Sequence, residues 1–305
     1  MTGIRFDGRT AIVTGAGTGL GRAHALGLAA RGANVVVNDL GVAKDGSIQG
    51  SDAANAVIAE IKNMGGRAIA NGANVANYEQ VQSMVQDAIS TFGAVDILIN
   101  NAGILRDKTF AKMDLDDMRL VLDVHLMGSV NCSKAVWPHM LEREYGRIVM
   151  TTSASGMYGN FGQSNYGAAK AGMVLLSKHI ALDMQRFNVR SNCIAPSAWT
   201  RMTGSIPTNT PDKAARVAQR QMVTPDKNAP LAVFLASDAA KDVNGQVFYT
   251  RMNEIFLMSQ SRPVRGLQRN EGWTPRLIAE HALPAFKPDF YPLERNQDVF
   301  SWDPV

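Results

Sequence analysis

Three polar residues, Ser153, Tyr166 and Lys170, have the types and the spacing that oxidation of an alcohol requires. Tyr166 and Lys170 are four residues apart, so on a helix they lie on the same face. A lysine ammonium beside a phenol favours the phenolate, and we expect it to lower the pKa of Tyr166 from about 10. Such a tyrosine can exchange a proton with an alcohol or carbonyl oxygen, which the Ser153 hydroxyl can also hydrogen-bond. The set predicts hydride transfer between a nicotinamide and a secondary alcohol; three unrelated polar residues are the alternative.

A glycine-rich segment follows the first apolar run of the chain. Residues 10–14 (Thr-Ala-Ile-Val-Thr) are typical of a buried parallel strand, and residues 22–31 are helix-like. Glycines between a strand and a helix let the backbone approach a pyrophosphate, and the helix N-terminus offers it free N–H groups. A plain turn is the alternative, but the strand–turn–helix context favours a dinucleotide site. The expected cofactor-binding residues of this turn are Gly15, Gly17, Thr18, Gly19, Leu20 and Gly21.

Asp39 follows a second apolar run, residues 34–38, and lies 24 residues after Gly15. A carboxylate at this position accepts hydrogen bonds from the adenosine ribose hydroxyls and repels a 2′-phosphate. The position therefore favours NAD over NADP. Asp39 can also start a turn before Gly41, and the two roles are compatible.

Strand and helix patterns alternate as far as residue 250. This alternation predicts an α/β fold with a doubly wound, parallel, seven-stranded sheet of the Rossmann type. The expected strands are 10–14, 34–38, 67–71, 95–99, 146–151, 189–194 and 246–249. The expected helices are 20–31, 51–64, 77–92, 115–143, 165–187 and 226–236.

The remaining segments divide the chain into a domain, 1–250, and an extension, 251–305. Within the domain, residues 40–50 are expected to form a loop beside the cofactor. The long Pro- and Thr-rich stretch 196–225 is a candidate substrate lid. The extension has little β pattern, and we expect it to pack on the domain or on a neighbouring subunit. Its expected anchors are Trp273, Tyr291 and Trp302.

The composition argues against several functional classes. Charged residues make up 19% of the 305 residues, and the net charge of +4 comes from scattered Lys and Arg, which disfavours nucleic-acid binding. A sequence pI near 9.1 is compatible with an anionic substrate. Cys132 and Cys193 lie in apolar segments without a metal-ligand pattern, so core thiols in a reducing compartment are expected. A signal peptide, a membrane span and a C-terminal Ser-Lys-Leu are not found, so we expect a cytoplasmic protein. From the cysteine pattern we also expect no bound metal.

Two further motifs complete a resemblance to the short-chain dehydrogenase/reductase family over residues 5 to about 250. They are Asn100-Asn101-Ala102-Gly103 after the fourth strand and Ile194-Ala195-Pro196 after the sixth. The resemblance implies a homodimer or homotetramer, with Lys170 holding the nicotinamide ribose. It also implies that the cofactor contacts include Asn74, Val75, Asn101, Ala102, Gly103, Tyr166, Lys170 and Pro196.

A closer resemblance is to the (3R)-hydroxyacyl-CoA dehydrogenase domains of peroxisomal multifunctional β-oxidation enzymes and their bacterial stand-alone relatives. It implies NAD-dependent oxidation of a (3R)-hydroxyacyl-CoA to a 3-oxoacyl-CoA. A 17β-hydroxysteroid or another hydroxysteroid is the alternative substrate, and a catalytically silent NAD-sensing scaffold is the remote one. The motifs that carry this resemblance are Arg5-Phe-Asp-Gly, 37–41, 100–106, 124–128, 158–166 and 195–203.

The chain departs from the family pattern at several positions. The helical Asn that usually joins the catalytic set is His125, 28 residues before Ser153, whereas Asn131 lies six residues too late. His125 is a candidate catalytic residue that could hold a proton-relay water, and core packing is its alternative role. Asn74 replaces an adenine-contacting Asp, and Ser197 replaces a Gly after Pro196. The family's Gly-Gly near 250–253 is absent, and the hydratase and sterol-carrier parts are replaced by the tail. Surface charges that could contact a phosphate are Arg106, Lys108 and Arg201, with a solvated role as the alternative.

Overall fold

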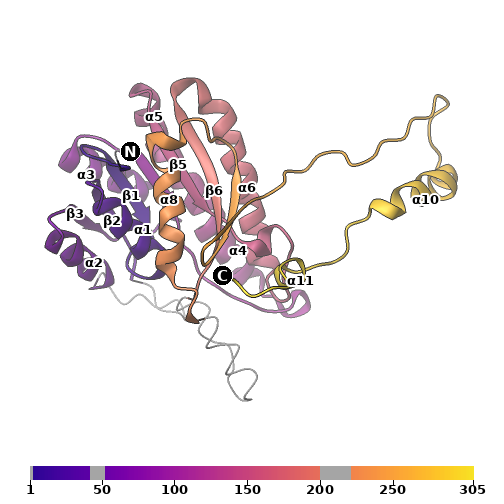
Figure 1. The fold of residues 1–305 in the computed structure, drawn as a ribbon, viewed down its shortest axis with the longest axis horizontal. Coiled ribbons are helices and arrows are strands. Elements are labelled where there is room, and N and C mark those ends of the chain that lie inside the picture. Colours follow the sequence, from indigo (N-terminus) through magenta and orange to yellow (C-terminus); the bar gives the residue numbers. More distant parts are fainter. Residues whose placement is uncertain (1–2, 42–51, 200–220) are drawn as a thin grey trace, which may run out of the picture.

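The computed structural model describes residues 3–41, 52–199 and 221–305, which form an α/β fold around one sheet (Figure 1). The strand order is β3-β2-β1-β4-β5-β6-β7-β8, so the chain winds outward in both directions from β1. Strands β1 to β7 pair in parallel, which confirms the predicted doubly wound class. The strands are β1 (Thr10–Thr14), β2 (Asn34–Asn38), β3 (Arg67–Asn71), β4 (Ile97–Asn100), β5 (Gly146–Thr151), β6 (Val189–Ser197), β7 (Val247–Arg251) and β8 (Glu254–Leu257).

Helices cover both faces of this sheet, and alternate side chains of each strand belong to different cores. Val13 of β1 packs in the core beneath α1, α2 and α8, whereas its neighbour Ile12 packs in the core beneath α3, α5 and α6. Burial on both faces explains why the central residues of β1, β2 and β4 are apolar. The helices are α1 (Gly19–Ala29), α2 (Asp52–Asn63), α3 (Tyr78–Phe92), α4 (Leu115–Leu122), α5 (Gly128–Glu142), α6 (Ser164–Met184) and α8 (Ala229–Leu235).

The long helix predicted over 115–143 is divided. Between α4 and α5 lies a π-helical turn, Asp123–Met127. Its backbone hydrogen bonds join residues five apart, one residue more than in an α-helix. Single π turns of this kind are frequent at functional sites because they turn a side chain out of helical register. The turn carries the buried His125.

The C-terminal extension contains an eighth strand, so the predicted count of seven is corrected. Met252 and Asn253 form a two-residue turn, with φ of 51° at Met252, and β8 returns antiparallel to β7. Only alternate residues of β8 are half-buried, which gives a four-residue pattern too short to distinguish from a loop. Beyond it, the segment carrying α9 (Pro275–Leu277) and α10 (Leu283–Phe286) extends away from the sheet (Figure 1).

The last residues come back to the β7–β8 hairpin through α11 (Asn296–Val299). The N–H of Asn253 donates to the carbonyl of Val305 over 2.8 Å, and Phe300 is buried 4.8 Å from the Tyr249 ring. The extension is therefore anchored at both ends of its length. Of the predicted lid 196–225, residues 200–220 lie outside the described residues, as do 42–50 of the loop 40–50. Among the helices of the described ranges, none is long and apolar enough to span a membrane.

Candidate active site

Ser153, Tyr166 and Lys170 come together where β5 ends and α6 begins. Ser153 follows β5 in extended conformation, and its hydroxyl accepts the N–H of Ser155 over 3.2 Å. Tyr166 and Lys170 lie on the first two turns of α6, and a side-chain hydrogen bond joins Tyr166 to Ser153. Ser153 and Tyr166 line one cavity of about 340 Å³. The spacing seen in the sequence thus places two oxygen atoms where they can contact one substrate oxygen.

Burial has the largest effect on the charges at this site. It raises the pKa of Tyr166 to about 12, although the hydrogen bond from Ser153 lowers it in part. Burial also lowers the pKa of Lys170 to about 7. The ammonium nitrogen donates to the carbonyl of Thr151 and lies 5.5 Å from the centroid of the Tyr166 ring. The expected lowering of the tyrosine pKa is therefore wrong for this state, because desolvation of the phenolate outweighs the hydrogen bond from Ser153.

His125 lies directly behind the tyrosine. Its ring contacts the Tyr166 ring edge-on, and its Nε2 lies 2.8 Å from the carbonyl oxygen of Ile104 and 3.0 Å from the N–H of that residue. Burial, and secondarily the charge of Lys170, lowers the pKa of His125 well below its ordinary value, so the ring is neutral. A Cβ on Gly103 would lie 2.2 Å from the His125 ring, so the glycine is needed for the contact. His125 thus connects the Asn-Ala-Gly segment to the tyrosine and does not line the cavity.

The glycine-rich turn fits the diphosphate of a dinucleotide. Gly15 has φ of +63°, and a Cβ on Gly21 would lie 2.2 Å from the carbonyl oxygen of Gly15. Thr18 caps α1 without a side-chain hydrogen bond, so first-turn N–H groups are left for an anion. Gly19 and Leu20 begin the helix. The turn therefore has the close backbone approach and the free donors that a pyrophosphate requires.

Asp39 is held against this turn. Its Oδ2 accepts the N–H of Gly17 over 2.8 Å, and its Oδ1 accepts the N–H of Gly41 over 2.8 Å. Both roles considered from the sequence, a carboxylate beside the cofactor turn and the start of a turn at Gly41, are compatible with this geometry. Each oxygen keeps a lone pair for a further donor.

The Asn-Ala-Gly segment after β4 braces the same turn. The hydroxyl oxygen of Thr14 accepts the N–H groups of Asn101 and Ala102, and the Asn101 amide donates to the carbonyls of Thr14 and Gly15. A Cβ on Gly15 would lie 2.8 Å from the Cα of Ala102. These contacts fix the carboxyl ends of β1 and β4, the point where the strand order reverses and where ligands bind in such sheets.

The other predicted cofactor contacts occupy the same edge of the sheet. Asn74 Oδ1 accepts the N–H of Ala76 over 3.0 Å, which leaves one lone pair for another donor. Val75 is buried, and its carbonyl accepts the side-chain amide of Asn131, which braces the loop away from the chemistry. Pro196, near the end of β6, lines the cavity with Ser197.

The charged residues considered as phosphate contacts form ion pairs where the structure describes them, and the two cysteines are buried. Arg106 and Lys108 both pair with Asp117, with N–O distances of 3.5 and 2.7 Å, and Arg201 lies outside the described residues. Cys132 and Cys193 are buried free thiols, as predicted. In the described ranges, no group of His, Cys, Asp or Glu side chains is arranged to hold a metal.

Part of the cavity wall was not predicted from the sequence. Tyr249 of β7 and three residues of the C-terminal extension, Arg295, Asn296 and Gln297, line the same cavity as Ser153 and Tyr166. Tyr249 is 96 positions after Ser153 in the sequence, and the three tail residues are more than 140 positions after it. No local spacing indicates the contact, since it depends on the β7–β8 hairpin and on the return of the tail.

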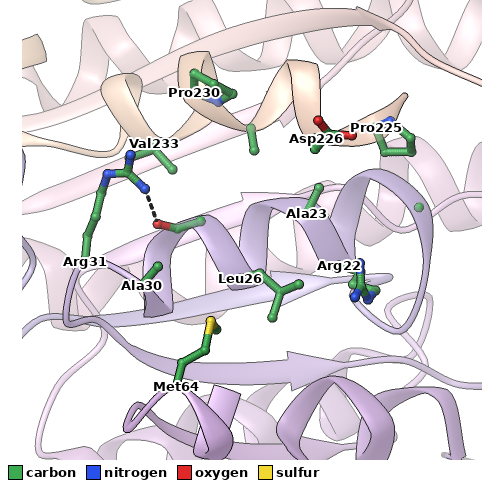
Figure 2. A pocket seen from close by; sticks show the side chains of 13 residues that line it. Arg22, Ala23, Leu26, Ala30, Arg31, Met64, Pro225, Asp226, Pro230 and Val233 are labelled. Carbon is green, nitrogen blue, oxygen red and sulfur yellow. Dashed lines mark hydrogen bonds between the residues drawn. The ribbon is translucent and has the colours of Figure 1, made fainter. Parts of the chain in front are cut away.

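A second hollow, of about 460 Å³, lies between α1 and α8 (Figure 2). Its lining is mostly apolar and includes Leu26, Met64 and Val233, and Arg31 at one end donates to the carbonyl of Gly27. Neither Ser153 nor Tyr166 contributes to it. This groove is separate from the chemistry considered above.

Comparison with known proteins agrees with this geometry. The family model for short chain dehydrogenases matches residues 9–210. Peroxisomal multifunctional enzyme type 2 of Mus musculus is 41% identical over 280 residues, which cover 91% of this chain and 36% of that protein. Hydroxyacyl-CoA dehydrogenase ChsB1 of Mycobacterium tuberculosis is 36% identical over 279 residues, which cover 88% of this chain and 86% of that protein. The chain thus spans about a third of the mouse enzyme and most of the bacterial one.

Solved structures give the same result. A short chain dehydrogenase from Mycobacterium avium superposes with a TM-score of 0.81 at 38% identity, covering 94% of this chain and 97% of that one. A 7α-hydroxysteroid dehydrogenase complexed with NADH and 7-oxo glycochenodeoxycholic acid superposes with a TM-score of 0.72 at 33% identity, covering 82% and 95%. This chain therefore belongs to the short chain dehydrogenase family. It is an oxidoreductase of a class that uses nicotinamide cofactors.

Proposed function

We propose that this protein oxidises the 3-hydroxyl of a (3R)-hydroxyacyl-CoA to the 3-oxo compound with NAD. One observation carries the proposal: Leu20 of the cofactor turn lines the same cavity as Ser153 and Tyr166. A substrate alcohol in that cavity would contact the two hydroxyls and lie beside the start of the dinucleotide site. This is the juxtaposition that hydride transfer needs.

Each residue of the site has a separate role in the reaction at the substrate oxygen. When bound, the nicotinamide supplies the hydride acceptor for the carbinol carbon. The Ser153 hydroxyl orients the substrate oxygen, and Tyr166 in its phenolate form accepts the hydroxyl proton. Lys170 holds the nicotinamide ribose and stabilises the phenolate, while His125 supports the tyrosine ring. In the reverse direction the protonated Tyr166 donates to the carbonyl oxygen, and this form is favoured by its raised pKa.

Asp39 supports NAD as the cofactor. Its carboxylate lies within hydrogen-bond distance of the Gly17 N–H, beside the glycine turn. A 2′-phosphate at the adenosine ribose would add negative charge next to this carboxylate, with an electrostatic cost that NAD avoids.

The acyl-CoA substrate is supported by the relatives. The M. tuberculosis relative is named a hydroxyacyl-CoA dehydrogenase, and this chain covers most of it. The alternative, a 17β- or other hydroxysteroid, is favoured by the similarity to a 7α-hydroxysteroid dehydrogenase structure. A catalytically silent NAD-sensing scaffold is the remote alternative. The hydrogen bond between Ser153 and Tyr166 disfavours it, because a scaffold does not need this pair.

The deciding experiment compares the 3R and 3S enantiomers of one 3-hydroxyacyl-CoA with a 17β-hydroxysteroid at equal concentrations. NADH formation is followed by absorbance. Ser153, Tyr166 and the nicotinamide form a chiral site, so one enantiomer is expected to react, and we propose the 3R form. A preference for 3S, or turnover of the free steroid alone, contradicts the acyl-CoA proposal and leaves an NAD-dependent dehydrogenase. Turnover of any of these alcohols excludes the scaffold.

We also propose that the protein is a homodimer or homotetramer in which the extension contributes contacts. The segment between β8 and α11 exposes apolar side chains that a second copy could cover. They include Val264, Leu267, Trp273, Ile278, Leu283, Phe290, Tyr291 and Leu293. Light scattering at several concentrations gives the mass, and a monomer at all of them would contradict this proposal.

A further inference from the structure

The C-terminal end of the chain supplies a polar wall to the catalytic cavity. Arg295, Asn296 and Gln297 line it together with Ser153 and Tyr166. Of the three, Arg295 is occupied elsewhere, since its guanidinium makes two hydrogen bonds to the carboxylate of Asp298. Asn296 is the wall residue whose side chain is held by β7 and not by a neighbouring charge.

Asn296 is fixed in place by its contact with β7. Its side-chain N–H donates to the hydroxyl of Tyr249 over 3.0 Å, and the same hydroxyl is hydrogen-bonded to Ser197. Tyr249 and Ser197 line the cavity as well. Three polar residues from β6, β7 and the tail thus form a continuous string on this wall.

Ring packing and hydrogen bonds attach the tail that carries Asn296 to the β7–β8 hairpin. The Phe300 ring packs 4.8 Å from Tyr249 and 4.9 Å from Phe256, and the carbonyl of Trp302 accepts a hydrogen bond from Arg251 over 3.0 Å. The Arg295 N–H is capped by Asp298 over 2.9 Å at the start of α11. These contacts hold the backbone on both sides of Asn296, next to the β7–β8 hairpin and at the start of α11.

One end of that amide has no partner. Asn296 Oδ1 is buried, and no hydrogen-bond donor of the described residues reaches it. A buried acceptor without a donor is unfavourable, and a ligand that brings an N–H or O–H to it removes the cost. Asn296 Oδ1 requires a hydrogen-bond donor, so it favours substrates that carry an N–H or O–H group at this position.

We infer that Asn296 is a specificity-determining residue that accepts a hydrogen bond from the amide N–H of a thioester substrate's cysteamine arm. The inference rests on the proposed function, because it assigns a role within the same cavity. In a 3-hydroxyacyl thioester, this N–H is a few bonds beyond the thioester sulfur, whereas a steroid skeleton has no amide donor. Both CoA and acyl carrier protein present the same amide, so the shared group is the cysteamine amide itself.

The test uses two small thioesters of one 3-hydroxy acid. One is the N-acetylcysteamine thioester, and the other is its S-(4-oxopentyl) analogue, in which CH₂ replaces the N–H and the carbonyl group is kept. The full enzyme with NAD is expected to prefer the first by at least about 10-fold in kcat/KM, since the analogue leaves the acceptor unpaired. In Asn296→Leu the preference should fall to about 1, with kcat/KM for the analogue within about 2-fold of the original value.

Two further variants keep the result interpretable. Tyr249→Phe frees the Asn296 amide and is expected to reduce the preference, so it carries the test if Asn296→Leu fails to fold. Asn63→Leu changes an exposed asparagine at the end of α2 and should leave the preference intact. The CoA and carrier-protein thioesters, assayed in parallel, show which of them delivers the amide.

The outcomes separate this inference from the proposed function. Turnover of both thioesters with equal efficiency by the unmodified enzyme overturns the role of Asn296 and leaves the hydroxyacyl thioester as substrate. An equal loss with both thioesters in Asn296→Leu also overturns it, because that result indicates a purely structural residue. Turnover of the steroid but of neither thioester overturns both proposals.

Discussion

The rings of His125 and Tyr166 contact each other edge-on, with centroids 5.1 Å apart and planes at 88°. His125 is held on its other side by the backbone of Ile104, with Nε2 2.8 Å from the carbonyl oxygen. The tyrosine therefore depends for its orientation on a neutral imidazole that the π-helical turn directs inward. This geometry favours a positioning role, in which His125 acts through the tyrosine ring.

Two variants separate the ring contact of His125 from its polar contact. His125→Phe keeps a ring against Tyr166, and kcat is expected to stay within about 3-fold. His125→Gln keeps a polar group near Ile104 but loses the ring, and kcat should fall at least about 10-fold as the phenol loses its orientation. Steady-state kinetics and thermal unfolding of both variants check this. An equal loss in the two variants would favour the proton-relay role.

Replacing Tyr166 by Phe tests the proton transfer. The substitution keeps the ring against His125 and removes the hydroxyl, so turnover is expected to fall at least about 100-fold, the usual scale for an acid–base group. NAD binding, measured by fluorescence or calorimetry, should persist. Normal turnover by this variant would exclude Tyr166 as the proton acceptor.

The pH dependence of the unmodified enzyme follows from the same residue. Burial raises the pKa of Tyr166 to about 12, so the phenolate that accepts a proton becomes more abundant as pH rises. We expect kcat/KM for alcohol oxidation to increase between pH 7 and 10, and kcat/KM for ketone reduction to show no such increase. A pH profile for each direction decides this. A rise in both directions would assign the titration to another group.

Asp39 is expected to set the cofactor preference. NAD should exceed NADP in kcat/KM by at least about 10-fold, equal to about 1.4 kcal/mol. Asp39→Asn keeps an oxygen that can accept the Gly17 N–H but removes the charge, so it should narrow the gap without unfolding the turn. Steady-state kinetics with both cofactors measure the ratio of kcat/KM for NAD to that for NADP. Equal values in the unmodified enzyme would contradict the role of Asp39 in cofactor preference.

The sequence predicted those features that arise from neighbouring residues. The strands at 10–14, 34–38 and 146–151 have the observed bounds, because burial on both faces leaves each with an apolar centre. The strand at 67–71 also has the observed bounds, although β3 lies at the edge of the sheet and is only partly buried. Tyr166 and Lys170 share a helix face because they are four residues apart on one helix. Asp39 and Gly17 also come together as expected, since both lie where parallel strands end.

What could not be predicted depends on contacts between distant segments or on burial. Asn296 meets Tyr249 only after β8 has turned back and the tail has crossed the hairpin. The pKa of Tyr166 depends on desolvation, which the Tyr–Lys spacing does not reveal. The π-helical turn at His125 is likewise invisible in a periodicity that fits a continuous helix. In each case a tertiary effect outweighs the local sequence pattern.

His24 gives a test of stability that is independent of catalysis. This residue is fully buried on α1, and neither ring nitrogen has a hydrogen-bond partner among the described residues. Burial lowers its pKa from 6.5 to about 4, so it is neutral in the folded protein at pH 7. In the unfolded chain the imidazole gains a proton near pH 6.5. The stability that His24 contributes is therefore fully present above pH 6.5 and is lost as pH falls toward 4.

Replacing His24 by Leu should remove this dependence. One pKa unit corresponds to about 1.4 kcal/mol, so at pH 5 protonation of the unfolded chain costs the original protein about 2 kcal/mol of unfolding free energy relative to pH 8. His24→Leu cannot bind that proton, and at pH 8 it leaves no polar partner unpaired. Denaturant unfolding of both proteins at pH 8 and 5 should show the original losing about 2 kcal/mol more than the variant. Parallel losses would mean that His24 is accessible to protons in the folded state.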